Sequence, residues 1–249
     1  ASYREKIDTG YNGIHEIYNG YNINLKNSFN KTYKRNNWSS NQNLSLGKFK
    51  AENHQGNLAT HTRTSFGGNI RNAYTIWKSS SKDKYIDNSY KFVPSILKNE
   101  LNLVSDLNLA INNYSNYGSQ NIIRFSFGPE LTIGNYRNNF LDYTSLVTFL
   151  EITNKSGSSP FKFDDVNDDL KLYLSLNQQL IKSLSLDVSS YFNIDKSSDK
   201  YSKFNNTKYA LNWNRRAYNL QIYYEEDTKN AGLNFTIFGM PFDGLGKKF

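Results

Sequence analysis

Few side chains in this sequence have the types and spacing that catalysis needs. The chain has 3 His and no Cys, so disulfides and thiolate metal sites are excluded. His61 and Ser65 form the one histidine–serine pair that is close in sequence, and a serine nucleophile needs a base of this kind oriented by a third polar group. No carboxylate nearby is placed to orient the histidine. The sequence therefore predicts a protein that is not an enzyme.

A second candidate for chemistry is the acidic segment from Asp165 to Asp169, which reads D-x-N-x-D like the opening of a calcium loop. A calcium loop of this kind requires glycine at the sixth position and glutamate at the twelfth. Leu170 and Leu176 occupy those two positions. The segment is therefore interpreted as a solvated acidic loop, and neither a metal nor another cofactor is expected.

The third candidate is a set of arginines that could contact phosphate. Arg215 and Arg216 precede Tyr218, and Arg137 lies in a second polar segment. The planar guanidinium suits phosphate oxygens, so we expect these three arginines to steer lipid phosphates. An alternative is that they face a water-filled lumen and pair with loop carboxylates. The net charge is +8, but the basic residues are scattered and no nucleic-acid-binding motif is present, so a nucleic-acid partner is not expected.

Strands must position these side chains, because the apolar residues recur with a period of two. Between residues 170 and 177, leucine alternates with polar or amphipathic residues: Leu170, Leu172, Leu174 and Leu176 on one face, and Lys171, Tyr173, Ser175 and Asn177 on the other. The same alternation recurs at Leu184–Ile194, Tyr209–Trp213 and Leu233–Ile237. A polar loop is expected around residues 31–43.

The amino-acid composition indicates which class of β protein these strands form. The chain has 19 Tyr and 16 Phe, yet its mean hydropathy is −0.71. No apolar run is long enough for a membrane-spanning helix, which needs about 18 residues. Abundant aromatics, small polar residues and alternating strands are typical of a transmembrane β-barrel. We therefore expect residues 1–249 to form a single all-β domain, an antiparallel barrel of about 12 to 16 strands, most of them near 9–11 residues long.

The stretch GPELTIGNYRNNFLDYT, followed by SPFKFDD, resembles a family of cyanobacterial outer-membrane proteins related to the lipopolysaccharide-assembly protein LptD. The residues that carry the resemblance are Gly128, Pro129, Glu130, Gly134, Tyr136, Arg137, Asp142, Tyr143, Thr144, Ser159, Pro160, Phe161, Phe163, Asp164, Asp168 and Gln179. The resemblance implies an outer-membrane barrel of a Gram-negative envelope that passes lipopolysaccharide or a related glycolipid to the outer leaflet. It also implies outer-membrane lipids and periplasmic bridge components as partners.

Relatives of that kind have barrels of about 26 strands, more than this chain can hold. The resemblance therefore implies the C-terminal part of a larger barrel, or a shortened one. Periodicity alone leaves two other classes open, a general diffusion porin or other channel, and a soluble all-β binding domain. The loop at Pro160 and Phe161 is expected to be ordered and packed on the barrel, because proline restricts the backbone and phenylalanine favours burial.

Overall fold

The structure is a computed structural model, and it describes residues 2–4, 7–8, 16–79, 99–134, 139–164, 169–215 and 217–237. These residues form one antiparallel β-sheet, with a single turn of 3-10 helix at Lys162–Asp164. The all-β prediction is confirmed. No helix in the described ranges is long and apolar enough to cross a membrane.

Thirteen strands are described, and eleven of them have at least eight residues. In chain order they are β1 (Ser2–Arg4), β2 (Ile7–Asp8), β3 (Glu16–Tyr33), β4 (Asn36–Glu52), β5 (Leu58–Lys78), β6 (Glu100–Tyr114), β7 (Gly118–Ile133), β8 (Thr144–Gly157), β9 (Leu170–Ile181), β10 (Leu184–Asn193), β11 (Phe204–Asn214), β12 (Tyr218–Glu225) and β13 (Asn230–Ile237).

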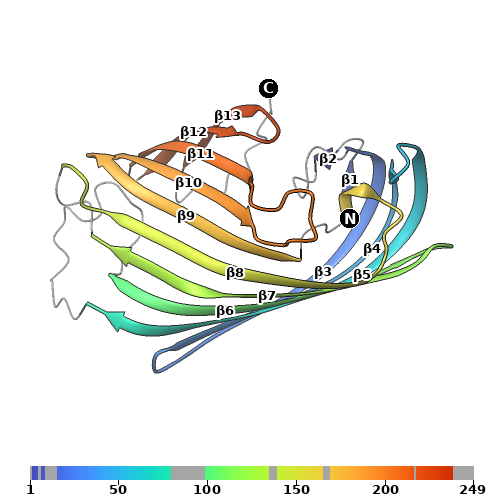
Figure 1. Cartoon of the computed structure of the whole chain (residues 1–249), viewed down its shortest axis with the longest axis horizontal. Coiled ribbons are helices and arrows are strands. Elements are labelled where there is room, and N and C mark those ends of the chain that lie inside the picture. The colour runs from blue at the N-terminus through green and yellow to red at the C-terminus, as the bar shows by residue number, and fades with distance from the viewer. Residues whose placement is uncertain are drawn as a thin grey trace.

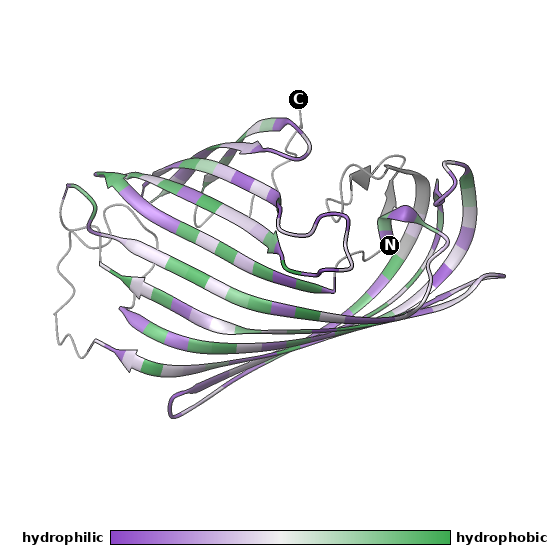
Figure 2. Ribbon diagram, in the orientation of Figure 1, coloured by the Kyte–Doolittle hydropathy of each residue, from purple (hydrophilic) through white to green (hydrophobic). Residues whose placement is uncertain are grey.

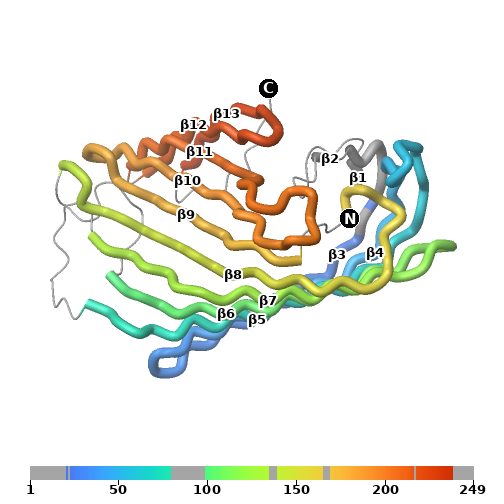
Figure 3. The backbone as a smooth tube through the Cα atoms, viewed as in Figure 1, coloured from blue at the N-terminus to red at the C-terminus, as the bar shows by residue number. Residues whose placement is uncertain are grey.

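From β3 to β13 each strand pairs with the next strand in sequence, so the sheet is an up-and-down meander. Figures 1 and 3 show that it curves into an open trough. β1 and β13 are its two ends, and no pairing joins them within the described residues, so the sheet is not closed there.

The strands between residues 16 and 157 are longer than the sequence predicted. β3 to β8 have 14 to 21 residues each. The expectation of a polar loop around residues 31–43 is wrong, because β3 pairs with β4 up to Tyr33 and Asn36. Only Lys34 and Arg35 make the turn, and Lys34 has a φ of 53°. Backbone pairing continues here through polar residues that hydropathy alone assigns to a loop.

The two faces of the sheet have opposite character, and the apolar face is the exposed one. Along β11, Tyr209, Leu211 and Trp213 are exposed, whereas Ala210 and Asn212 are buried. Bands of the two colours alternate along the strands in Figure 2. We call these the apolar face and the polar face. A water-soluble sheet is arranged the other way, with its polar residues exposed.

The leucines of β9 lie on the apolar face. The register places Leu172 opposite Leu150 and Leu176 opposite Leu146, and both of these β8 leucines are exposed. Side chains at directly paired positions point to the same side of a sheet. The alternation in β9 therefore has the two faces that the sequence predicted.

Candidate functional site

The polar face is joined across strands by side-chain hydrogen bonds. Near the β13 edge, Asn212 donates to Asp187 at 2.6 Å, Gln221 donates to Asn212 at 2.9 Å and Asn234 donates to Gln221 at 3.0 Å. Asn212, Gln221 and Asn234 occupy paired positions of β11, β12 and β13. The face is thus a hydrogen-bonded polar surface that holds its side chains in fixed positions.

Charged groups of both signs lie on the same face. Arg71 pairs with Glu130 at 2.8 Å, and Arg124 pairs with Glu151 at 3.2 Å. Asn69 also donates to the carboxylate of Asp106 at 2.7 Å. The polar face therefore carries arginine–carboxylate pairs, but their arginines are Arg71 and Arg124, not the three expected from the sequence.

Residues 158–164, which we call the inward loop, leave the end of β8 and fold back over β4, β5 and β6 on the polar face. Phe161 is fully buried and stacks on Phe163 with ring centroids 5.0 Å apart. The Phe161 ring makes edge-to-face contacts with Phe49 and Tyr114, at centroid distances of 6.5 and 6.0 Å. The prediction of an ordered, packed Pro160–Phe161 loop is confirmed, and this loop supplies two of the five buried residues of the described apolar cluster.

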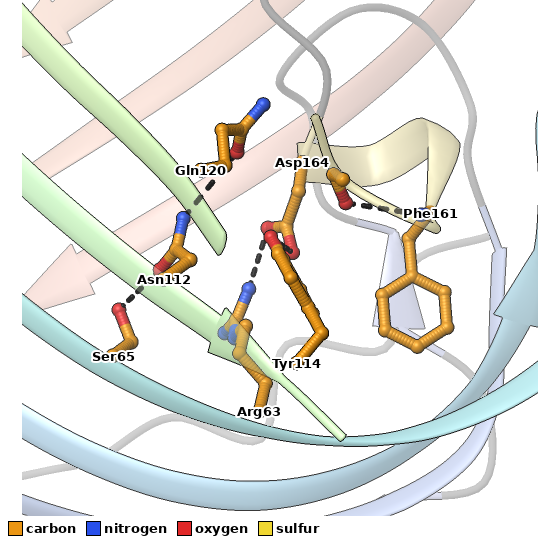
Figure 4. A network of polar contacts seen from close by, with 8 residues as sticks. Arg63, Ser65, Asn112, Tyr114, Gln120, Phe161 and Asp164 are labelled. Atoms are coloured by element: carbon orange, nitrogen blue, oxygen red, sulfur yellow. Dashed lines mark hydrogen bonds and ion pairs between the residues drawn. The ribbon is translucent and has the colours of Figure 1, made fainter. Parts of the chain in front are cut away.

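Ion pairs fix the inward loop at its other end. Arg63 donates to Asp164 at 2.5 Å, and the Tyr114 hydroxyl donates to the same carboxylate at 2.9 Å (Figure 4). Lys162 pairs with Glu52 at 2.6 Å. The Arg63 and Asp164 side chains are only 16% and 11% exposed, so their charges are largely removed from water and depend on one another.

His61 and Ser65 have different hydrogen-bond partners. The His61 ring contacts the carbonyl oxygen of Ser115 at 2.8 Å and packs against Phe161. Ser65 donates instead to Asn112 at 2.6 Å, and Asn112 donates to Gln120, as Figure 4 shows. His61 thus supports the inward loop, and Ser65 belongs to the polar network.

The residues that carry the family resemblance have structural roles where they are described. A Cβ atom on Gly128 would lie 1.9 Å from the Thr148 carbonyl oxygen, so β7 and β8 approach each other closely there. Next to it, Pro129 lacks a backbone N–H, and the β7–β8 pairing is interrupted between Phe127 and Glu130. Pro160 is buried within the inward loop.

A second group of these residues ties the β7–β8 loop to β9. Gly134 has a φ of 87°, and a Cβ atom there would lie 1.4 Å from the Asp142 carbonyl oxygen. The Asp142 N–H donates to the Gln179 side chain at 2.8 Å, and the Gln179 amide donates to the Lys182 carbonyl at 2.7 Å. Burial raises the pKa of the nearby Tyr143 hydroxyl.

Several residues from the sequence analysis lie outside the described part of the chain: Tyr136, Arg137, Asp165, Asn167, Asp168 and Arg216. Arg215 is described, and it does not point into the polar face. Its guanidinium lies over the Trp213 ring, 5.5 Å from the centroid, on the apolar side. In the described ranges no group of three His, Asp or Glu side chains could hold a metal ion.

The three tryptophans of the chain lie at one rim of the sheet. Trp38, Trp77 and Trp213 are all exposed, and each is within two residues of the end of β4, β5 or β11. In an up-and-down meander these three ends lie at the same rim, where β3 connects to β4, β9 to β10 and β11 to β12. We call it the tryptophan rim. The opposite rim carries the inward loop.

Together these features define a class, the all-β proteins in which one antiparallel sheet exposes its apolar face and shields its polar face. The chain itself belongs to the family described as "Protein of unknown function (DUF3769)", whose model matches residues 1–240. No curated protein and no solved structure matches the chain.

Proposed function

We propose that this chain forms the wall of an outer-membrane β-barrel that passes lipopolysaccharide, or a related phosphorylated glycolipid, to the outer leaflet. The observation that carries the proposal is the reversed polarity of the sheet. Leu25, Phe66, Phe125, Leu211 and Phe235 come from five different strands and are all exposed. Such a continuous apolar surface is unfavourable in water and favourable against lipid chains.

The tryptophan rim also supports the proposal that the apolar face contacts lipid. Tryptophan and tyrosine are enriched where a membrane meets water, because their rings are apolar at one end and polar at the other. Trp213 stands beside Tyr218, with ring centroids 6.4 Å apart. An aromatic belt at this rim would mark one membrane–water boundary, and the strands between the two rims would cross the apolar core.

The polar face supports a passage for an amphiphile that carries charge. Fixed arginines, carboxylates and amides line it, and the inward loop occupies part of it. Of the three arginines proposed to contact lipid phosphates, Arg137 and Arg216 are assigned to this passage, whereas Arg215 lies over Trp213 on the apolar side and is not. The resemblance of the segment GPELTIGNYRNNFLDYT adds the substrate class, since alternation by itself suits any barrel.

A general diffusion porin is the second candidate, favoured by the dense hydrogen bonding of the polar face. Depletion of the protein in its own cells separates the two. Transport predicts that surface-exposed glycolipid falls before the permeability to small hydrophilic solutes changes. A fall in solute permeability with normal surface glycolipid would reject transport in favour of the porin.

A further inference from the structure

A hollow of about 340 Å³ lies at the tryptophan rim, where the β3–β4 turn stands beside the end of β5 and the start of β6. Thr75 lines the hollow and donates its hydroxyl to Asn102 at 2.8 Å, and the Asn102 amide donates to Glu100 at 3.1 Å. Asn102 is paired in register with Glu130, whose carboxylate belongs to the polar face. The hollow is therefore a recess at one end of the polar face.

The backbone holds three basic residues around this hollow: Lys34, Arg35 and Lys78. Lys34 and Arg35 form the β3–β4 turn, and the Thr75 N–H donates to the Arg35 carbonyl at 2.8 Å, which ties the turn to β5. Lys78 ends β5 and is paired in register with Glu100. The three basic side chains thus extend from backbone positions that are fixed by strand pairing.

The lining of the hollow has an excess of positive charge. Among the described residues that line it, three are basic and Glu100 alone is acidic, so two positive charges are in excess. A phosphate monoester carries about −1.5 to −2 charges at pH 7 and has three strong acceptor oxygens. The charge of such a group is therefore complementary to the charge of the hollow.

We propose that this hollow binds the phosphate group of a phosphorylated ligand, with Arg35 and Lys78 on its oxygens. The planar arginine fork can bind two oxygens at once, and lysine supplies a point charge on a flexible chain. The Lys34 ammonium lies over the Tyr33 ring, 5.3 Å from its centroid, so it is assigned no contact with the ligand.

The position of the hollow indicates where the phosphate comes from. Trp77 directly precedes Lys78, and tryptophans mark the membrane–water boundary in the proposed orientation, so the hollow lies at the level of lipid headgroups. The inference deepens the proposed function and rests on it for the source of the phosphate, which is the headgroup of the glycolipid that passes along the polar face. A free phosphate ion has the same chemistry, and the experiment separates the two sources.

Protection of Lys78 from acylation measures the occupancy of the hollow. The full chain is reconstituted in nanodiscs of phosphatidylcholine, its lysines are acetylated with sulfosuccinimidyl acetate, and each lysine is quantified by mass spectrometry. One arm adds inorganic phosphate, and the other replaces part of the phosphatidylcholine with phosphatidic acid, whose phosphate is also a monoester. By mass action, we expect Lys78 to react about tenfold more slowly when the probe is at about ten times its dissociation constant.

The two arms and an internal control decide the result. Protection in the lipid arm assigns the site to a headgroup, protection in the phosphate arm alone assigns it to free phosphate, and protection in neither arm overturns the proposal. Lys182, in the β9–β10 turn at the same rim and outside the hollow, is the control. Equal slowing of Lys182 would also overturn the site, because anionic lipid would then protect lysines along the rim in general.

Three variants test the assigned residues. R35Q should abolish the protection of Lys78, whereas R35K, which keeps the charge, should retain it. Glu100→Gln keeps an oxygen that can accept from Asn102 but removes the negative charge, so protection should need a several-fold lower probe concentration. Unchanged protection in R35Q, or weaker protection in E100Q, would reject the assignment.

Failure of the site and failure of the proposed function give different results. Protection of Lys78 together with normal surface glycolipid after depletion of the protein would retain the hollow as a phosphate site and reject glycolipid transport. A fall in surface glycolipid after depletion, with no protection of Lys78 in either arm, would retain transport and reject the hollow.

Discussion

Arg63 and Asp164 lie 101 residues apart in sequence, and their side chains meet at 2.5 Å on the polar face. Arg63 projects from β5, and Asp164 ends the 3-10 turn of the inward loop. The guanidinium also lies over the Phe49 ring at 4.8 Å and near the Phe163 ring at 5.5 Å. One arginine thus contacts both the charge and the aromatic cluster that hold the loop against the sheet.

Replacing Asp164 with Asn should release the inward loop. The substitution leaves the Arg63 charge without its carboxylate in a largely buried place, which costs roughly 3 kcal/mol or more. We expect faster chymotrypsin cleavage at Phe161 and larger ion conductance in planar bilayers. Lys162→Gln is the control, because the Lys162–Glu52 pair is about one-third exposed and such pairs contribute roughly 1 kcal/mol or less. Equal cleavage in both variants and the parent would mean that the ion pair does not hold the loop.

Gly128→Ala should disrupt the pairing of β7 with β8. The added Cβ would lie 1.9 Å from the Thr148 carbonyl oxygen, so the strands would have to separate. We expect a loss of stability well above 1 kcal/mol, seen as a lower urea midpoint in detergent. Gly68→Ala in β5 is the matched control, since nothing lies within 4 Å of its added Cβ. Equal midpoints for the two alanine variants would contradict the close approach.

Leu174→Asp should impair membrane assembly, because it places a charge on the apolar face of β9. A charge facing lipid near the middle of a bilayer costs up to a few kcal/mol. Ser175→Asp places the same charge on the neighbouring residue of the polar face and should be tolerated. Tyr173→Asp is a less clean control, since the Tyr173 ring stacks on Phe149 and also contacts the Tyr191 ring. The yield of folded protein in vesicles measures the difference, and equal yields would show that the assigned faces are wrong.

The β10–β11 loop should loosen in acid. Hydrogen bonds from the Ser197 hydroxyl, then from the backbone N–H groups of Asp169 and Ser197, lower the pKa of Asp195. Its stabilising contribution is therefore present above the unfolded-state pKa and is lost as pH falls through the lowered folded-state pKa. Hydrogen exchange at the Asp169 amide, corrected for the intrinsic rate, should accelerate over that range. Asp195→Asn should remove this pH dependence, and an unchanged profile in the variant would reject the assignment.

The sequence predicts the face of each strand better than its length. A period of two gives the orientation of Leu174 and Ser175 without any tertiary information, because neighbouring side chains point to opposite sides of a strand. Strand ends depend on backbone pairing, which does not require apolar residues, so the extension of β3 and β4 through residues 31–43 was not predictable from hydropathy. The register of β5 against β6 also shifts between Thr75 and Trp77, and hydropathy does not predict such an irregularity.

The candidate site was only partly predictable. Burial of the inward loop follows from Phe161 and Phe163, two aromatics beside a proline. Its partners Arg63 and Tyr114 carry no local signal, because the contact is made across the sheet between distant segments. Arg215 was expected to steer lipid phosphates, with a lumenal position as the alternative, and neither expectation predicts that its guanidinium lies over Trp213 on the apolar side.

A cysteine scan of β11 tests the central claim most directly, because the chain has no cysteine of its own. Single cysteines at positions 209 to 213 are each labelled with a nitroxide in the protein reconstituted into bilayers. Collision rates are measured with oxygen, which partitions into lipid, and with a water-soluble nickel complex. The account predicts that labels replacing Tyr209, Leu211 and Trp213 collide with oxygen, whereas labels replacing Ala210 and Asn212 do not. Water-like accessibility at all five positions, or the opposite alternation, would contradict a membrane-facing apolar surface.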